Sequence, residues 1–355
     1  MCSPHNPLHC VIPPHMLDRL ADCDDAGLRG RALKMIKRAQ HLRAQRSLIF
    51  DQPRTQLRGM LSGIDPHSAR RVRRTHDAEG KEELPGKLVR GEDDPPTGDP
   101  MIDEAHEGGG ITWDFYHQVF LRNSIDDAGM ILDQSVHYGK DFMNAFWDGN
   151  QMSYGDGDGE IFDRFTLDLD IIGHELTHGV IQHEAGFRYW FQSGALNESF
   201  ADVFASLIKQ WHLGQDVTQA DWLVGNNVLL GEGFALRSLQ APGTAYVDHP
   251  QLGTDPQPAH MKDYQELGAW DDNGGVHINS GIPNHAFYRV AMELGGHAWE
   301  RAGKIWYRAL CDHTKVDDTF VKAAQATLRA AREEFGMGSL EQQAVERAWT
   351  GVGVL

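Results

Sequence analysis

Cysteine is scarce in this chain of 355 residues. Only four cysteines occur, too scattered to suggest a disulfide framework, and no C-x-x-C pair points to a structural zinc site. They are Cys2, Cys10, Cys23 and Cys311. We therefore expect reduced thiols.

Long apolar runs are also missing. No stretch approaches the roughly 20 apolar residues that cross a bilayer, so membrane insertion is not expected. The start of the chain has neither the basic region nor the apolar run of a signal peptide. The expected location is therefore cytoplasmic, or secreted without a cleaved signal peptide.

Basic residues are outnumbered, with 33 Lys and Arg against 51 Asp and Glu and a formal net charge of −18. So acidic a chain disfavours nucleic acid and anionic membranes as principal partners. The 41% hydrophobic and 24% charged residues are ordinary for a globular protein, and the length allows two domains plus a leader.

Residues 1–50 differ from the rest of the chain. The stretch Val11 to Leu17, with Pro13 and Pro14, predicts an extended segment, because a residue before proline is pushed away from helical conformations. A basic helix is expected over residues 28–48. Its apolar face is expected to hold Leu33, Ile36, Ala39, Leu42 and Leu48. A basic leader on an acidic body fits a docked pro-segment, and it equally fits a solvated helix.

The remaining sequence divides into two halves. Residues 55–165 are rich in Gly, Asp and Pro and predict a β-rich half with long loops, whereas helical periodicity begins after residue 165. Further helices are expected near residues 284–295, 297–312, 317–335 and 339–349. The layout predicts an α+β protein with a β-rich half, a central helix and a helical half.

The central helix carries the sequence His-Glu-Leu-Thr-His. His174 and His178 are four residues apart, so on a helix both project from one face and can hold the same ion. Glu175 can then reach a metal-bound water as general base. The pattern alone is only moderately specific, because a histidine pair on an exposed helix is often plain polar surface.

A second pair of polar residues lies on the next expected helix. Glu198 can supply a third zinc ligand and leave the fourth position to water. Asp202, one helical turn later, can accept a hydrogen bond from the far nitrogen of a ligand histidine. The plainer alternative, a capping or salt-bridging role, is disfavoured by the position of the pair twenty residues after His178.

A third cluster lies in a glycine-rich segment near residue 275. His277 follows turn-forming glycines that can aim a side chain at a cleft. Asp272 can hold the imidazole in its charged form. A lone histidine in such a loop is usually structural, but the other two clusters favour a catalytic interpretation.

Together these motifs resemble those of the thermolysin-like metallopeptidases, over about three quarters of the chain from residue 84 onward. The motifs are Asn144-Ala-Phe-Trp147, His174 to His178, Gly194-Ala-Leu-Asn-Glu198 through Asp202, and Asn273 to Gly281. The resemblance implies a two-domain fold with the zinc site in the cleft at the central helix. It also implies a zinc-dependent metalloendopeptidase that hydrolyses peptide bonds.

The resemblance assigns roles to matching residues. The zinc ligands would be His174, His178 and Glu198; the catalytic groups Glu175, Tyr189, His277 and Asp272; and the supporting carboxylate Asp202. Substrate main-chain contacts would come from Asn144, Ala145 and Arg237. A pocket for a bulky apolar side chain after the scissile bond would be formed by Phe165, Ile171 and Leu236. One departure is Lys209, which replaces an acidic residue and makes a family calcium site beside Asp170 doubtful.

The short leader resembles that of the protealysin-like branch, which implies a removable propeptide lying across the cleft. An extended segment suits this role, because it can pair with an edge strand as a substrate would. A sharper variant has Cys10 or a nearby histidine binding the zinc. The expected units are residues 1–50, the propeptide; 51–190, a β-rich N-terminal catalytic domain ending in the central helix; and 191–355, the α-helical domain.

Expected partners are protein or peptide substrates and the chain's own propeptide, with a proteinaceous inhibitor left open. Two alternatives compete. A non-catalytic zinc-binding partner or scaffold protein would leave Glu175, Tyr189 and His277 without a role, and structural zinc usually has four protein ligands. An aminopeptidase would need an acidic anchor for the substrate amine, for which the sequence offers no motif.

Overall fold

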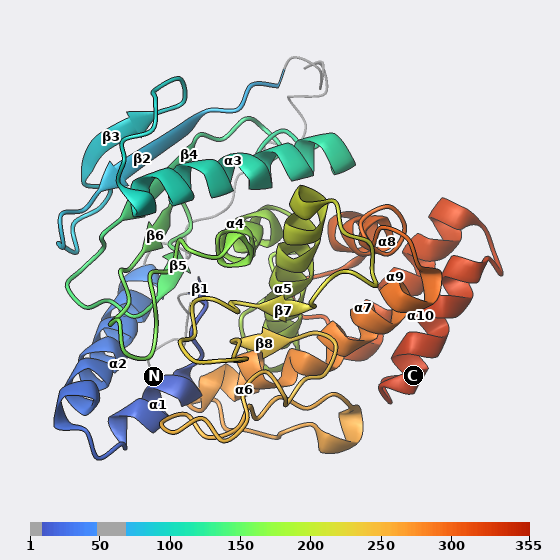
Figure 1. Ribbon diagram of the computed structural model, residues 1–355. Coiled ribbons are helices and arrows are strands. Elements are labelled where there is room, and N and C mark those ends of the chain that lie inside the picture. Colours follow the sequence, from blue (N-terminus) through green and yellow to red (C-terminus); the bar gives the residue numbers. More distant parts are fainter. Residues whose placement is uncertain (1–8, 48–68) are drawn as a thin grey trace.

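The computed structural model describes residues 9–47 and 69–355 (Figure 1). It shows a mixed sheet on one side, two long helices through the middle and a helical region on the other side. The strands are β1 His9–Cys10, β2 Arg73–Asp77, β3 Lys87–Gly91, β4 Leu132–Val136, β5 Ala145–Trp147, β6 Met152–Tyr154, β7 Leu223–Val224 and β8 Arg237–Ser238. The α+β layout predicted from the sequence is confirmed.

The main sheet has six strands in the order β1-β5-β6-β4-β2-β3. Strand β4 runs parallel to both of its neighbours, and the other pairs are antiparallel. Strand β1, from the N-terminal segment, lies at one edge and pairs Cys10 with Phe146 of β5. The two-residue strands β7 and β8 form a separate hairpin.

The helices follow sequence signals of varying strength. They are α1 Pro14–Ala21, α2 Ala26–Ser47, α3 Pro100–Phe120, α4 Leu169–His183, α5 Phe191–Leu213, α6 Asp272–Asn279, α7 Gly281–Leu294, α8 Ala302–Arg308, α9 Phe320–Phe335 and α10 Leu340–Gly351. A short 3₁₀ segment spans Met261–Asp263, and a π-helical turn, Ala309–His313, follows α8. Ser339 caps the last helix by accepting a hydrogen bond from the backbone of Gln342.

Helix α3 was missed by the sequence analysis, which expected strands and loops over residues 55–165. Three consecutive glycines in its middle argue against a helix by propensity. Packing explains them, because a Cβ at Gly108 would clash with Ile172 of α4 and one at Gly109 would clash with Gln134 of β4. The helix therefore fits closely between the sheet and α4 (Figure 1).

Helix α1 corrects one expectation for the N-terminal segment. It begins at Pro14, so the extended conformation expected over residues 11–17 ends at Pro13.

Helix α2 also differs in detail from the expectation. Its buried residues are Leu28, Ala32 and Met35, whereas Leu33, placed on the apolar face by the sequence analysis, is 46% exposed. The side chains of the expected residues from 39 onward lie outside the part of the helix whose burial is described.

Helices α4 and α5 form the buried centre of the molecule. They pack against each other, and α4 is buried from residue 170 through 181. A helix that is apolar nearly all round is a core helix. Polar residues in this centre, among them His174, His178 and Glu198, are therefore desolvated and need partners.

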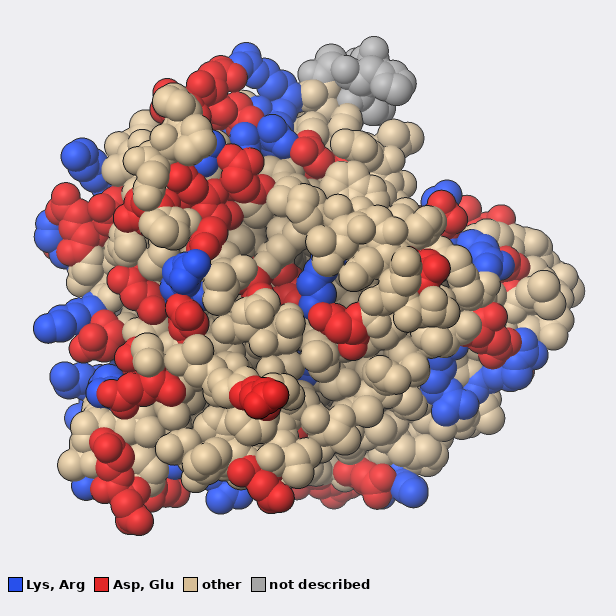
Figure 2. All heavy atoms as spheres, in the orientation of Figure 1, with Lys and Arg blue, Asp and Glu red and all other residues tan. Residues whose placement is uncertain are grey.

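Acidic side chains are spread over the displayed face rather than gathered in one patch (Figure 2). No helix among the described residues is long and apolar enough to cross a membrane.

Candidate active site

Two histidines and a glutamate meet where α4 packs on α5. The Nε2 atoms of His174 and His178 are 3.0 Å apart, and each lies 3.5 Å from a carboxylate oxygen of Glu198. All three side chains are buried. They form a group of potential metal ligands within 4.8 Å of one another, and this group does not include Cys10.

The far side of each imidazole is held by α5. Nδ1 of His174 lies 2.9 Å from Asp202, and Nδ1 of His178 lies 2.9 Å from the side-chain oxygen of Asn197. Such contacts fix the ring orientation and leave both Nε2 atoms directed inward. Asn197 was missed as a functional residue, although it lies beside Glu198 in the quoted motif.

Asp202 connects His174 with Arg237 of β8 and Asn284 of α7. Besides His174, it contacts the Arg237 guanidinium through bonds of 2.8 to 3.0 Å and accepts a bond from Asn284. Burial opposes ionisation, but Arg237 and His174 outweigh it and lower the pKa of Asp202 to about 2. The carboxylate is therefore ionised at neutral pH and keeps both neighbours in place.

The donor set fits a zinc ion. Two facing imidazole nitrogens and one carboxylate are the ligands of catalytic zinc sites. The Oε2 atom of Glu198 is buried without a hydrogen-bond partner, and it lies 3.5 Å from Nε2 of His174 and 3.6 Å from Nε2 of His277. Burial disfavours its charge, but His277 and His178 hold the pKa of Glu198 well below its ordinary range. The site therefore presents one fixed negative charge to a cation.

Glu175 lies on the same helix as the histidines and contacts the last residue of β5. Its Oε2 accepts a 3.0 Å hydrogen bond from the Trp147 backbone, and its Oε1 is buried without a hydrogen-bond partner. Burial raises the pKa of Glu175 to about 8. A desolvated carboxylate held from one side is suited to proton transfer on the other.

Tyr189 and His277 lie next to each other beside Glu198. The Tyr189 hydroxyl is 3.0 Å from Nε2 of His277 and also donates to Glu198. Asp272 lies 2.5 Å from Nδ1 of His277 and accepts a 2.8 Å bond from its backbone. Burial opposes the imidazolium, but Glu198 and Asp272 raise the pKa of His277.

The glycines before His277 have a clear conformational role. Gly274 and Gly275 have φ of 83° and 80°, in the left-handed region where other residues are strained. The backbone turns there and then enters the short helix of His277. From the sequence His277 is expected in a loop, whereas it lies in the helical part of α6.

The three residues expected to line an apolar pocket are all buried. Ile171 and Leu236 approach the same point beside Gly225, and Phe165 is buried in the same apolar core.

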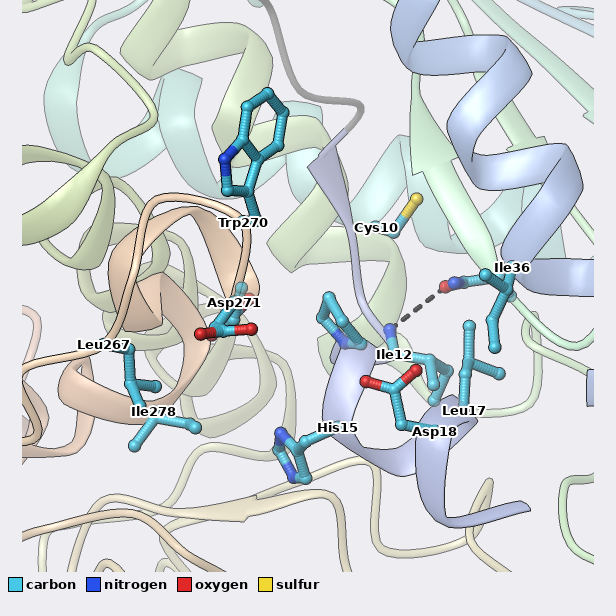
Figure 3. A pocket seen from close by; sticks show the side chains of 13 residues that line it. Cys10, Ile12, His15, Leu17, Asp18, Ile36, Leu267, Trp270, Asp271 and Ile278 are labelled. Atoms are coloured by element: carbon cyan, nitrogen blue, oxygen red, sulfur yellow. Dashed lines mark hydrogen bonds between the residues drawn. The ribbon is translucent and has the colours of Figure 1, made fainter. Parts of the chain in front are cut away.

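The N-terminal segment occupies the cleft. Its backbone at residues 10–12 contacts Ala145, Asn144, Arg237 and His277. A cavity of about 230 Å³ remains between this segment and residues 267–278. Figure 3 shows Ile12 and His15 on one side of it and Trp270 and Asp271 on the other.

Sequence comparisons agree with this geometry. Residues 61–182 match the thermolysin metallopeptidase catalytic domain, and residues 185–354 match the thermolysin metallopeptidase alpha-helical domain. The chain belongs to the thermolysin family of metallopeptidases. It is a metalloendopeptidase of that family, as the sequence motifs predicted.

Individual relatives narrow the placement to the protealysin branch. The chain is 46% identical to an extracellular metalloprotease of Pectobacterium carotovorum, over 98% of this chain and 97% of that one. It is 50% identical to protease PrtS of Photorhabdus, over 79% and 76%. The structure of the precursor of protealysin, a metalloproteinase from Serratia proteamaculans, matches with a TM-score of 0.85 at 46% identity, over 98% of this chain and 100% of that one. The thermolysin-like metallopeptidase is therefore made as a zymogen.

Proposed function

We propose that the roles expected from the motifs belong to these residues in a zinc-dependent endopeptidase. A zinc ion held by His174, His178 and Glu198 would lower the pKa of a bound water and polarise the scissile carbonyl. The supporting observation is the convergence of Glu175, Tyr189 and His277 on one buried donor set. A scaffold protein needs none of these three.

The protein groups divide the chemistry. Glu175 takes a proton from the attacking water through its unpartnered oxygen and delivers it to the leaving amine. Tyr189 and His277 donate hydrogen bonds to the oxyanion, and loss of one such donor typically costs about 10²–10³ in rate. Asp272 orients His277, and Asp202 orients His174 and Arg237.

Substrate binding is assigned to β5 and β8. Asn144, the Ala145 backbone and Arg237 would hold the substrate main chain along the sheet edge. The pocket of Phe165, Ile171 and Leu236 would accept a bulky apolar side chain after the scissile bond. We also assign residues 1–50 to the propeptide, 51–190 to the catalytic domain ending in α4 and 191–355 to the helical domain.

Cleavage of a quenched peptide with Leu or Phe after the scissile bond tests this function. Protein freed of its propeptide is expected to cut the peptide, to lose activity with a zinc chelator and to regain it with zinc. A peptide with Asp at the same position is expected to have a kcat/KM lower by about 10²-fold, because two to three kcal/mol of pocket burial is lost. Bound zinc without cleavage would contradict an enzymatic role.

Two further assignments extend the function. Lys209 donates to Asp170, Asp221 and the Leu223 carbonyl, so we propose that its ammonium takes the place of a calcium ion.

The name of the Pectobacterium relative, an extracellular metalloprotease, supports action outside the cell.

Acid is expected to loosen the propeptide through His15. Its Nε2 lies 3.0 Å from the Tyr246 hydroxyl, and its Nδ1 is buried without a partner. Burial lowers its pKa to about 4, against about 6.5 in a released segment. The charged and titratable groups around it are Asp272, His277, Arg237 and Arg19. A depressed histidine pKa means that docking is fully favourable above pH 6.5 and weakens as the pH falls toward 4.

Hydrogen exchange at residues 9–21 measures this effect. In a Glu175→Gln background, protection is expected to fall by up to about tenfold per pH unit between pH 6 and 4, after correction for intrinsic exchange. His15→Gln, which remains neutral, is the matched control and is expected to flatten this dependence. An identical pH profile in both proteins would assign the effect to another group.

A further inference from the structure

Four backbone contacts fix the register of the propeptide in the cleft. The Cys10 carbonyl lies 3.1 Å from Nε2 of His277, and the Val11 amide donates to the Ala145 carbonyl at 3.3 Å. The Arg237 guanidinium donates a 2.9 Å bond to the Val11 carbonyl. The Ile12 amide donates a 3.0 Å bond to the Asn144 side chain, drawn as the dashed line in Figure 3. Residues 10–12 therefore use the groups assigned above to substrate.

The order of these contacts locates one peptide bond. In the proposed mechanism His277 donates a hydrogen bond to the carbonyl that becomes the oxyanion. In this structure His277 contacts the Cys10 carbonyl. Arg237 is expected to bind a substrate carbonyl on the side of the leaving amine. In this structure Arg237 binds the carbonyl of the next residue, Val11. The segment thus runs antiparallel to β5 with the bond between residues 10 and 11 at the scissile position.

The side chain after this bond suits the pocket. Val11 is apolar and fully buried, as a residue seated in an apolar pocket would be. Glu175 accepts a hydrogen bond from the Trp147 backbone of β5, the strand with which the propeptide segment pairs. A segment that only blocked the cleft would not need substrate direction, an apolar residue after the bond and the oxyanion donor together.

We propose that the zymogen hydrolyses its own Cys10–Val11 bond, an inference that rests on the proposed function. Water adds across the bond, Cys10 keeps the new carboxylate, and Glu175 passes the water proton to the amine of Val11. The cut releases residues 1–10 and makes Val11 the new N-terminus.

This first cut does not open the cleft. Residues from Val11 onward stay covalently attached to the body, and Arg237 and Asn144 still hold them. Arg31 pairs with Glu160 at 2.5 Å and Arg38 with Glu82 at 2.7 Å, which keeps α2 on the catalytic domain. Activation therefore has two steps, an internal cut after Cys10 and a later removal of the remaining propeptide.

Intact mass spectrometry of the full-length, zinc-loaded precursor tests the internal cut. Loss of residues 1–10 is expected before loss of the whole propeptide, with a first-order rate that does not change on tenfold dilution. Glu175→Gln is expected to keep the bond. Val11→Glu, which puts a charge at the apolar pocket, is expected to slow the cut by at least about 10²-fold, whereas Val11→Leu keeps it.

Hydrogen exchange in an inactive precursor tests how residues 10–12 lie in the cleft without depending on cleavage. In the Glu175→Gln precursor, Val11→Glu is expected to lower hydrogen-exchange protection of residues 9–21, and Val11→Leu is expected to preserve it. The quenched-peptide assay on propeptide-free enzyme runs beside these measurements. If that enzyme cuts the peptide while the precursor keeps its Cys10–Val11 bond until the whole propeptide is lost, the internal cut is wrong and the proposed function stands. If neither substrate is cut, both are overturned.

Discussion

Glu175→Gln is expected to lower kcat for peptide hydrolysis by about 10²–10⁴-fold, because it removes the group that takes and returns the proton. The amide oxygen can still accept the hydrogen bond from Trp147, so the local packing is kept. The three zinc ligands are untouched, and the zinc content measured by atomic absorption is expected to remain near one ion per chain.

A control variant shows whether the loss of kcat is specific to Glu175. Glu300→Gln removes an exposed glutamate far along the helical region and is expected to leave kcat and zinc content unchanged. A Glu175→Gln protein with near-normal turnover would show that another group is the base. Loss of zinc together with activity would instead show that Glu175 supports the donor set rather than the proton transfer.

The sequence predicted the parts of the site that depend on local spacing. His174 and His178 lie on one helix, so their separation alone places both imidazoles on the same face. Glu198 and Asp202 follow the same rule on α5. The family resemblance is confirmed by the comparisons, whereas the individual catalytic roles remain predictions.

The missed features depend on contacts between distant segments. Helix α3 has a glycine run that weakens its propensity, and only its fit against Ile172 and Gln134 explains that run. The buried face of α2 is set by the surface on which it docks, so periodicity alone chose Leu33 wrongly. The role of Asn197 requires knowing how far α5 lies from His178.

Replacing Lys209 by Met is expected to lower the free energy of unfolding by about 3–5 kcal/mol, because it leaves a buried carboxylate uncompensated. The Asp170 side chain has no exposed area and lies 2.8 Å from the Lys209 ammonium. Chemical denaturation in the Glu175→Gln background avoids self-digestion. Lys304→Met, at an exposed lysine, is the control and is expected to change stability by no more than about 0.5 kcal/mol.

A second substitution asks whether the ammonium replaces a cation. Lys209→Asp adds a carboxylate to Asp170 and Asp221, so its stability is expected to fall in chelator and to recover as calcium is added, following the ligand's mass action. The unchanged chain is expected to have the same midpoint in calcium and in chelator. A midpoint that rises with calcium in the unchanged chain would show a calcium site that Lys209 does not replace. A Lys209→Met protein as stable as the parent would show that Asp170 does not need the ammonium.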